Sequence, residues 1–138
     1  MPLELEIVTP DKLLLSRAVE MVVIPAMEGD MGVLEGHTPM IVVLRGGTVS
    51  LYQGEHITDQ WFILGGFAEI TGERCTVLAT EAMLPSELRQ DHAESQLRQA
   101  EADYAALAGG DVDEQQLALD RIDAARAMVE AVAGTQAH

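Results

Sequence analysis

Alternating apolar and polar positions dominate the first 84 residues of the chain. Leu3-Glu4-Leu5-Glu6-Ile7 repeats with a period of two, which is typical of a strand with one buried face. Further strand-like runs, rich in β-branched residues and separated by glycine turns, cover residues 13–24 with a break at 16–18, and then 41–44, 48–52, 61–64, 67–70 and 75–80. Short strands at this density predict an antiparallel sandwich or barrel.

Residues 25–39 interrupt this pattern with three glycines and two prolines. The glycines permit positive φ or close backbone approach, and the prolines cannot donate to a strand ladder. We expect Pro25 to end the preceding strand and the whole segment to be a tight loop that the sheet holds rigid. The loop would present the polar residues Glu28, Asp30, Glu35 and His37.

At Pro85 the apolar period becomes helical, and alanine, glutamine, glutamate and leucine replace the β-branched residues. We therefore place a domain boundary here, with a β-sandwich at 1–84 and an antiparallel helical hairpin at 85–138. Ser86 is the expected N-cap of the first helix, Gly109-Gly110 ends it, and Asp111 opens the second. We expect the two helices to pack against each other through one apolar stripe on each. The stripe of the first helix is Ala93, Leu97, Ala100, Tyr104 and Leu107, and that of the second is Ala118, Ile122, Ala125, Val129 and Val132.

The chain of 138 residues carries a net charge of −15 and only 8 Lys and Arg. Phosphate binding needs clustered cations, so this balance argues against nucleic acid and against direct insertion into an anionic lipid surface. The single cysteine, Cys75, excludes an internal disulfide and lies in an apolar run, where packing is its expected role. The N-terminus is acidic, unlike a signal peptide, and no apolar run reaches about 18 residues, so we expect a cytoplasmic protein.

Candidate chemistry centres on His37 and the acids near it. We interpret His37 as an interface residue and expect no metal, because the chain's histidines lack ligand spacing and a cysteine pair: His37, His56, His92 and His138. Asp30 with Glu28 or Glu35 would form a catalytic pair only at short separation and with a raised pKa. The methionines around the loop suit a core or a contact surface equally well: Met21, Met27, Met31 and Met40.

Several motifs make this chain similar to one family. They are Glu28-Gly29-Asp30-Met31-Gly32-Val33-Leu34, Gly36-His37-Thr38-Pro39, Gly46-Gly47, residues 64–70, Thr76-Val77-Leu78-Ala79 and Gly110-Asp111-Val112-Asp113. In this order, in an acidic chain that ends in a helical hairpin, they resemble the epsilon subunit of bacterial F-type ATP synthases over nearly the whole length. Glu35 departs from the family, which usually has proline there.

The resemblance implies a sandwich of two five-stranded sheets followed by a two-helix hairpin. It implies a non-catalytic rotor subunit in the central stalk that binds the gamma subunit and the c ring, couples rotation to ATP synthesis and needs no cofactor. Such a subunit lies peripherally on the cytoplasmic face of the bacterial inner membrane. By position, Asp30, Glu28 and Met31 are expected to contact the c ring, and His37 and Met40 to contact gamma.

Some members of this family extend the hairpin into the alpha and beta catalytic subunits as a brake, and some sense ATP through an Ile/Leu-Asp-x-x-Arg-Ala motif in the first helix. Leu88, Arg89, His92 and Ala93 stand at the matching positions, so both charged residues of the motif are replaced and it is degenerate. The pattern recurs at residues 122–127 in the second helix, which we interpret as coincidence.

The hairpin carries four arginines against eleven aspartates and glutamates. In the family that the chain resembles, the braking helices are often basic, which suits insertion against acidic surfaces of the catalytic subunits. Like charges brought together in such a partly desolvated cleft cost several kcal/mol. We therefore expect inhibition by this hairpin to be weak or absent.

A different class of protein also fits a β-sandwich, namely a free-standing sandwich that binds a small ligand in its interior, as jelly rolls do. That function needs inward-facing polar residues on several strands. Residues 41–44 and 61–64 supply almost none, so the rotor-subunit interpretation is favoured.

Overall fold

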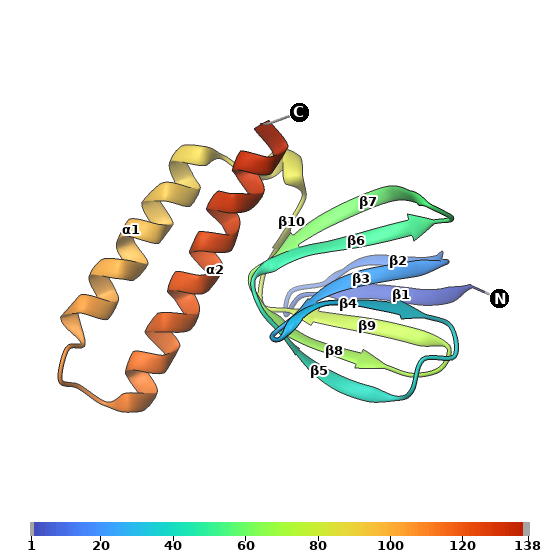
Figure 1. Ribbon diagram of the computed structural model, residues 1–138, viewed down its shortest axis with the longest axis horizontal. Coiled ribbons are helices and arrows are strands. Elements are labelled where there is room, and N and C mark those ends of the chain that lie inside the picture. Colours follow the sequence, from blue (N-terminus) through green and yellow to red (C-terminus); the bar gives the residue numbers. More distant parts are fainter. Residues whose placement is uncertain (1, 137–138) are drawn as a thin grey trace. The chain divides into compact units, whose positions relative to one another are not determined.

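The structure is a computed structural model that describes residues 2–136, with side chains through residue 132. The chain divides into two compact units between Leu84 and Pro85. The first contains ten strands within the described residues (Figure 1), namely β1 Leu3–Val8, β2 Leu13–Val19, β3 Met21–Ala26, β4 Gly29–Leu34, β5 Met40–Leu44, β6 Gly47–Gln53, β7 His56–Ile63, β8 Gly66–Ile70, β9 Arg74–Ala79 and β10 Ala82–Met83.

These strands form one continuous sheet that curls into a sandwich. The strand order is β10-β7-β6-β3-β5-β8-β9-β1-β2, and β4 pairs with β3 outside that path. Only one Cα pair, Ala26 with Leu44, joins β3 to β5. The sheet turns there, which leaves layers of β10-β7-β6-β3-β4 and β5-β8-β9-β1-β2, as the predicted pair of five-stranded sheets requires (Figure 1). The strand pairs are mostly antiparallel, as predicted, and β1 and β9 are the exception, since they run parallel.

The period-two pattern of the sequence becomes the buried face of each layer. In β1, Leu3, Leu5 and Ile7 are fully buried, while Glu4 is exposed and Glu6 half-buried. Equivalent apolar positions of the other long strands meet them to form one core. No polar or charged residue is buried among those that the structure describes, so this core offers a polar ligand no hydrogen-bonding partner.

The expected loop at 25–39 is for the most part a β-hairpin. Pro25 lies inside β3, opposite Asp30 of β4, and the pair Ala26 and Gly29 closes the hairpin. Met27 and Glu28 therefore form the whole β3–β4 turn, and the true loop is confined to residues 35–39. Proline is accommodated because Pro25 uses only its carbonyl, which accepts a hydrogen bond of 2.9 Å from the Arg45 backbone N–H. The expected break at 16–18 is likewise wrong, since β2 continues to Val19.

The second unit contains a short 3-10 helix, Pro85–Glu87, and two α-helices, α1 Gln90–Ala106 and α2 Val112–Gln136. Arg89, not Ser86, occupies the N-cap of α1, because the chain from Pro85 first makes the 3-10 turn. Gly109 follows α1 with φ +78, where glycine is favoured. The Asp111 carboxylate accepts a 2.8 Å hydrogen bond from the Asp113 N–H, so both of these predicted helix boundaries are confirmed.

The buried positions of the helices follow the expected stripes in part. The expected positions that are buried are Ala93, Ala100, Ala118, Ile122, Ala125 and Val132. Leu97 and Leu107 are only half-buried, Tyr104 is 37% exposed, and Met128 is fully buried where Val129 was expected. The spacing rule does not distinguish Met128 from Val129, because a helix of 3.6 residues per turn places both of these adjacent residues close to a wide apolar face.

Candidate functional site

The β3–β4 turn presents one apolar and one acidic side chain. The Met27 side chain is 54% exposed and Glu28 is exposed beside it. The Met27 backbone N–H donates to the Val43 carbonyl at 3.0 Å, which fixes the turn against β5. Exposed methionine is adaptable in packing, so the turn suits a contact surface.

Asp30, the second residue of β4, is paired within the chain. Its Oδ1 accepts a hydrogen bond from Nη2 of Arg45, a residue of the β5–β6 connection. The Asp30 side chain is 64% exposed and that of Arg45 is 37% exposed. The acid expected to contact a partner is therefore accessible but already has a counter-ion.

A groove of about 710 Å³ runs along β4 and β5. It is lined by residues 26–31 and 40–43, which bring the predicted ring contacts Glu28, Asp30 and Met31 beside Met40. Met31 is half-buried and also packs on the core, whereas Met40 is 40% exposed. Apolar side chains and the two acids Glu28 and Asp30 thus line the groove together.

His37 lies in the loop at the other end of β4. Its backbone N–H donates to the Leu34 carbonyl at 3.2 Å, and its Nδ1 lies 2.9 Å from the Thr38 carbonyl oxygen. The Gly36 N–H donates to Gly72 at 2.7 Å, which ties this loop to the β8–β9 turn. The half-buried His37 is accordingly held in place by the main chain around it.

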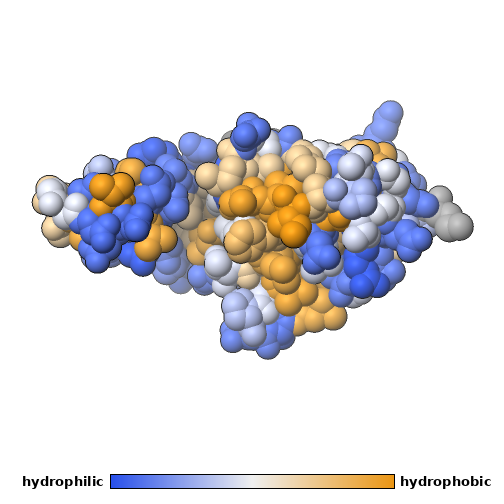
Figure 2. All heavy atoms as spheres, turned by 90° about the horizontal axis from the view of Figure 1, so that it is seen from below, coloured by the Kyte–Doolittle hydropathy of each residue, from blue (hydrophilic) through white to orange (hydrophobic). Residues whose placement is uncertain are grey.

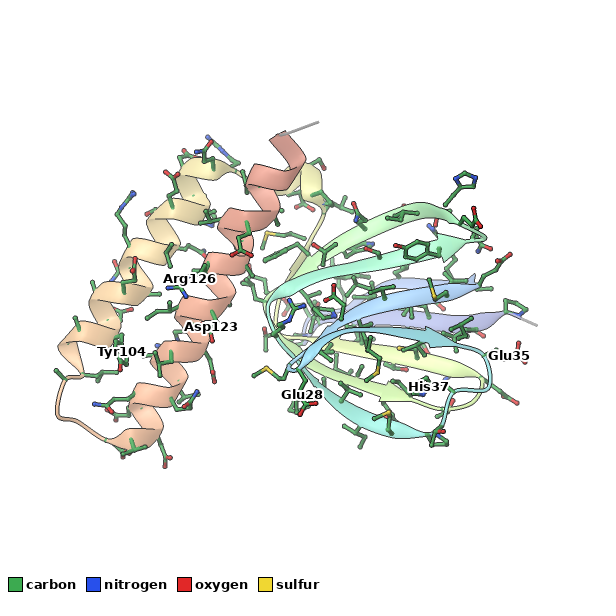
Figure 3. All side chains as sticks on the ribbon, viewed as in Figure 1. Glu28, Glu35, His37, Tyr104, Asp123 and Arg126 are labelled. Atoms are coloured by element: carbon green, nitrogen blue, oxygen red, sulfur yellow. The ribbon has the colours of Figure 1, made fainter. Side chains whose placement is uncertain are left out.

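Glu28 and His37 thus lie beyond opposite ends of a single strand, β4, whereas Met40 of β5 lines the same groove as Glu28, Asp30 and Met31. Figure 3 shows Glu28 at one end of β4, with Glu35 and His37 at the other. The five steps from Gly29 to Leu34 span about 17 Å at about 3.4 Å per residue. Glu28 and Asp30 therefore form no catalytic constellation with Glu35 or His37, and the two ends suit contacts with two different surfaces.

An apolar row crosses the outer face of one layer, where cross-strand partners are all apolar. It consists of Val43, Phe67, Leu78, Val8 and Leu13, each opposite the next in register. Phe67 is 52% exposed, and Val43 and Leu13 are similarly accessible. Figure 2, which views the molecule from below Figure 1, shows apolar side chains gathered over the sandwich. A contiguous exposed apolar area on a folded domain indicates an interaction surface.

In the described part of the chain, the side chains of Arg89 and His92 in the degenerate motif make polar contacts with near neighbours in sequence. Arg89 precedes α1 and its Nε lies 3.6 Å from the Asp91 carboxylate, while Nε2 of His92 lies 2.9 Å from the Gln96 amide nitrogen. Leu88 is half-buried, Ala93 is fully buried, and the remainder of the segment faces outward.

In the recurring pattern of α2, the small and apolar positions Ile122 and Ala125 are buried, and Asp123 and Arg126 are exposed (Figure 3). This is the distribution expected of any amphipathic helix.

Burial raises the pKa of the Cys75 thiol to about 12. Cys75 is fully buried in β9, so its thiol is not available as a nucleophile at neutral pH. Among the described residues, no group of three or more His, Cys, Asp or Glu side chains is arranged to hold a metal ion; His138 lies outside them.

Two features of this surface were missed from the sequence. The sequence analysis did not single out Arg45, although it is one of four cations in the first 84 residues and is followed by Gly46-Gly47, of which Gly47 leaves room for its side chain. The apolar row was missed because its members are far apart in the chain and meet only through strand pairing.

The first unit is a β-sandwich with an acidic turn and a separate histidine loop, and the second is an α-helical hairpin. Residues 2–85 match the family model described as the ATP synthase, Delta/Epsilon chain, beta-sandwich domain. The chain belongs to this family of ATP synthase subunits, as the sequence motifs predicted.

Curated bacterial relatives extend the match into the hairpin. The chain is 57% identical over 127 residues to the ATP synthase epsilon chain of Granulibacter bethesdensis, covering 92% of this chain and 94% of the relative. It is 42% identical over 134 residues to that of Gluconacetobacter diazotrophicus, covering 97% and 95%.

Two solved structures share the fold. A chain of the Euglena gracilis mitochondrial ATP synthase OSCP/F1/c-ring structure matches with a TM-score of 0.76 and 24% identity, covering 95% of this chain and 81% of that one. A chain of the Tetrahymena thermophila mitochondrial ATP synthase central stalk and c-ring structure matches with a TM-score of 0.70 and 15% identity, covering 96% and 97%.

Proposed function

We propose that this chain is a non-catalytic subunit of the central stalk, which binds the gamma subunit and the c ring and couples ring rotation to ATP synthesis. The observation that carries the proposal is the 57% identity with a bacterial epsilon chain over 92% of the sequence, which includes both units. A continuous sandwich with an apolar core supports it physically, because transmitted torque needs a stiff body.

The two ends of β4 support contacts with two partners. The β3–β4 turn, with Glu28, Asp30 and Met31, is the proposed ring-binding end, where carboxylates accept charge-assisted hydrogen bonds from basic or amide groups. His37 and Met40 are the proposed gamma contacts. The exposed apolar row supplies the kind of surface that protein partners cover.

The proposed location is the cytoplasmic face of the bacterial inner membrane, where the subunit is attached through the ring and gamma. Within residues 2–136, neither α-helix is long and apolar enough to cross a bilayer. Attachment through protein partners also suits a chain with a net charge of −15, which anionic lipids repel.

We propose that the hairpin binds the alpha and beta subunits only if it extends, and that it then inhibits ATP hydrolysis weakly. Its surplus of acids opposes insertion into an acidic cleft. The ATP-sensing motif lacks its charged residues at Arg89 and His92, so nucleotide binding there is not part of the proposal.

Native mass spectrometry tests the central proposal. The purified chain is mixed with a bacterial catalytic core that contains gamma but lacks epsilon, and with a matched core that lacks both. We expect one copy to bind the first core and none to bind the second. A properly folded chain that binds neither core, or both equally, contradicts the rotor-subunit function.

A further inference from the structure

Arg45 and Asp30 fasten the β3–β4 hairpin to the β5–β6 connection. The Arg45 side chain donates from Nη2 to Asp30 Oδ1, and its backbone N–H donates to the Pro25 carbonyl at 2.9 Å. Pro25 and Asp30 are themselves opposite one another in the hairpin. One residue therefore holds both strands of the hairpin, β3 through the main chain and β4 through the side chain.

The absence of a side chain at Gly47 leaves room for the Arg45 guanidinium. A Cβ placed on Gly47 would lie 2.8 Å from Nη1 of Arg45 and 2.8 Å from Cβ of Pro25, so a side chain there would displace them. Nη1 also donates to the Gly46 carbonyl at 3.3 Å. Gly47 thus leaves room for the Arg45 side chain, and the Gly46 carbonyl helps to orient it toward Asp30.

This fastening lies at the corner where the sheet passes from one layer to the other. Ala26 and Leu44, the single β3–β5 pair, are next to Pro25 and Arg45 in the chain. The Met27 N–H donates to the Val43 carbonyl just beyond that pair. The turn that carries Glu28 is therefore an extension of a corner that Arg45 braces.

The two acids of this end differ in their partners. The guanidinium neutralises Asp30, whereas exposed Glu28 makes no hydrogen bond or ion pair within the described part of the chain. Figure 3 shows Glu28 at the tip of the turn. A carboxylate without a counter-ion retains its full capacity to accept charge-assisted hydrogen bonds from another protein.

We propose that Arg45 is a positioning residue for the ring-binding end: it braces the β3–β4 turn and neutralises Asp30, so that Glu28 is the carboxylate presented to basic or amide groups of the c ring. This assignment rests on the proposed function and changes its details. Asp30 acts through Arg45 within the chain, and Glu28 makes the contact between chains.

The test measures the affinity of the full-length chain for two probes, a solubilised complex of gamma with the c ring and gamma alone. Glu28→Gln should weaken binding to the ring-containing complex about 1.4- to 5-fold, the range for an exposed charged contact, and leave binding to gamma alone unchanged. Glu55→Gln, an exposed acid in the β6–β7 turn, is the matched control and should change neither affinity.

Variants of Arg45 and Asp30 distinguish a role in positioning the β3–β4 turn from direct contact with the ring. Arg45→Met should weaken ring binding, and Arg45→Lys should restore it, because the pair uses a single N–O contact that an ammonium can replace. Asp30→Asn should have no further effect in the Arg45→Met background. Thermal unfolding of each variant confirms that the affinities compare folded chains.

Two results would overturn the assignment. One is an unchanged ring affinity in Glu28→Gln, and the other is an equal loss from Asp30→Asn with and without Arg45, which would make Asp30 the direct contact. Failure of the unmodified chain to bind gamma at all would instead contradict the proposed function, so the two failures are distinguishable.

Discussion

Arg17 of β2, the last strand of the strand order, forms an ion pair with Asp59 of β7, the second strand from the opposite end. β10 pairs with β7 only at Phe62 and Ile63, so the part of β7 that carries Asp59 is an edge like β2. Their neighbours in register, Leu5 and Leu51, are fully buried, which places both charges at inward positions. The pair closes the open side of the sandwich, and inward charges on edge strands oppose edge-to-edge aggregation.

Breaking this pair should have a small effect on stability. The Arg17 and Asp59 side chains are 43% and 40% exposed, and pairs of that exposure contribute about 0.2–1 kcal/mol. Arg17→Met and Asp59→Asn should each lower the free energy of unfolding in urea by that amount. The double variant should lose no more than the larger single loss, and strictly additive losses would show that the two side chains are not coupled.

Gly66 should tolerate no side chain. An ideal Cβ there would lie 2.0 Å from the Leu78 carbonyl oxygen, and φ is +142, a value that L-residues rarely adopt. We expect Gly66→Ala to destabilise the first unit by about 2–4 kcal/mol, from combined strain and overpacking. Gly72→Ala is the matched control, because nothing lies within 4 Å of its Cβ position and its φ is not positive. Equal melting temperatures for the two variants would contradict this account.

Substitutions at Leu5 and Phe67 should have different effects: the first should lower the stability of the fold, and the second should mainly weaken binding to the partner. Leu5 is fully buried in the core, so Leu5→Ala should cost about 2–5 kcal/mol in unfolding free energy. Phe67 is 52% exposed in the apolar row, and Phe67→Ser should cost far less while weakening binding to the gamma-containing core. Unfolding in urea and native mass spectrometry provide the two measurements. If the Phe67→Ser chain binds as tightly as the wild type, the apolar row is not part of the interface with the gamma-containing core.

Cys75 should make stability fall at alkaline pH. Burial raises its pKa from 9.0 to about 12, so above pH 9 the unfolded thiol ionises while the folded thiol retains its proton. Its contribution is fully present below pH 9 and is lost between pH 9 and 12, at about 1.4 kcal/mol per pH unit. The difference in unfolding free energy between wild type and Cys75→Ala should narrow over this range. A difference independent of pH would contradict burial as the cause.

Deleting residues 85–138 should leave ATP hydrolysis by the assembled enzyme nearly unchanged. The hairpin's eleven acids and four arginines make insertion into an acidic cleft unfavourable, so little inhibition exists to be relieved. Hydrolysis is assayed in enzyme reconstituted with the full chain or with residues 1–84, after native mass spectrometry confirms equal occupancy. A large rise in activity on deletion would show that the hairpin is an effective brake.

Local patterns in the sequence were sufficient for the fold class and for most boundaries. Alternation in β1, the change of period at Pro85, Gly109 after α1 and Asp111 before α2 each act within a few residues, and all four appear in the structure as expected. They act locally because strand periodicity, helix capping and positive φ depend on neighbouring residues alone. The motifs that indicated the family are likewise contiguous.

The sequence by itself determined that this chain is an acidic two-layer sandwich followed by a helical hairpin, and that it belongs to the epsilon-chain family. Only the tertiary structure decided that Pro25 lies within a strand, that β1 and β9 run parallel, and that Asp30 has Arg45 as its counter-ion while Glu28 does not. These features depend on pairing between residues that are distant in the chain. No local pattern specifies such pairings, because the free energy that selects them comes from packing the whole core at once.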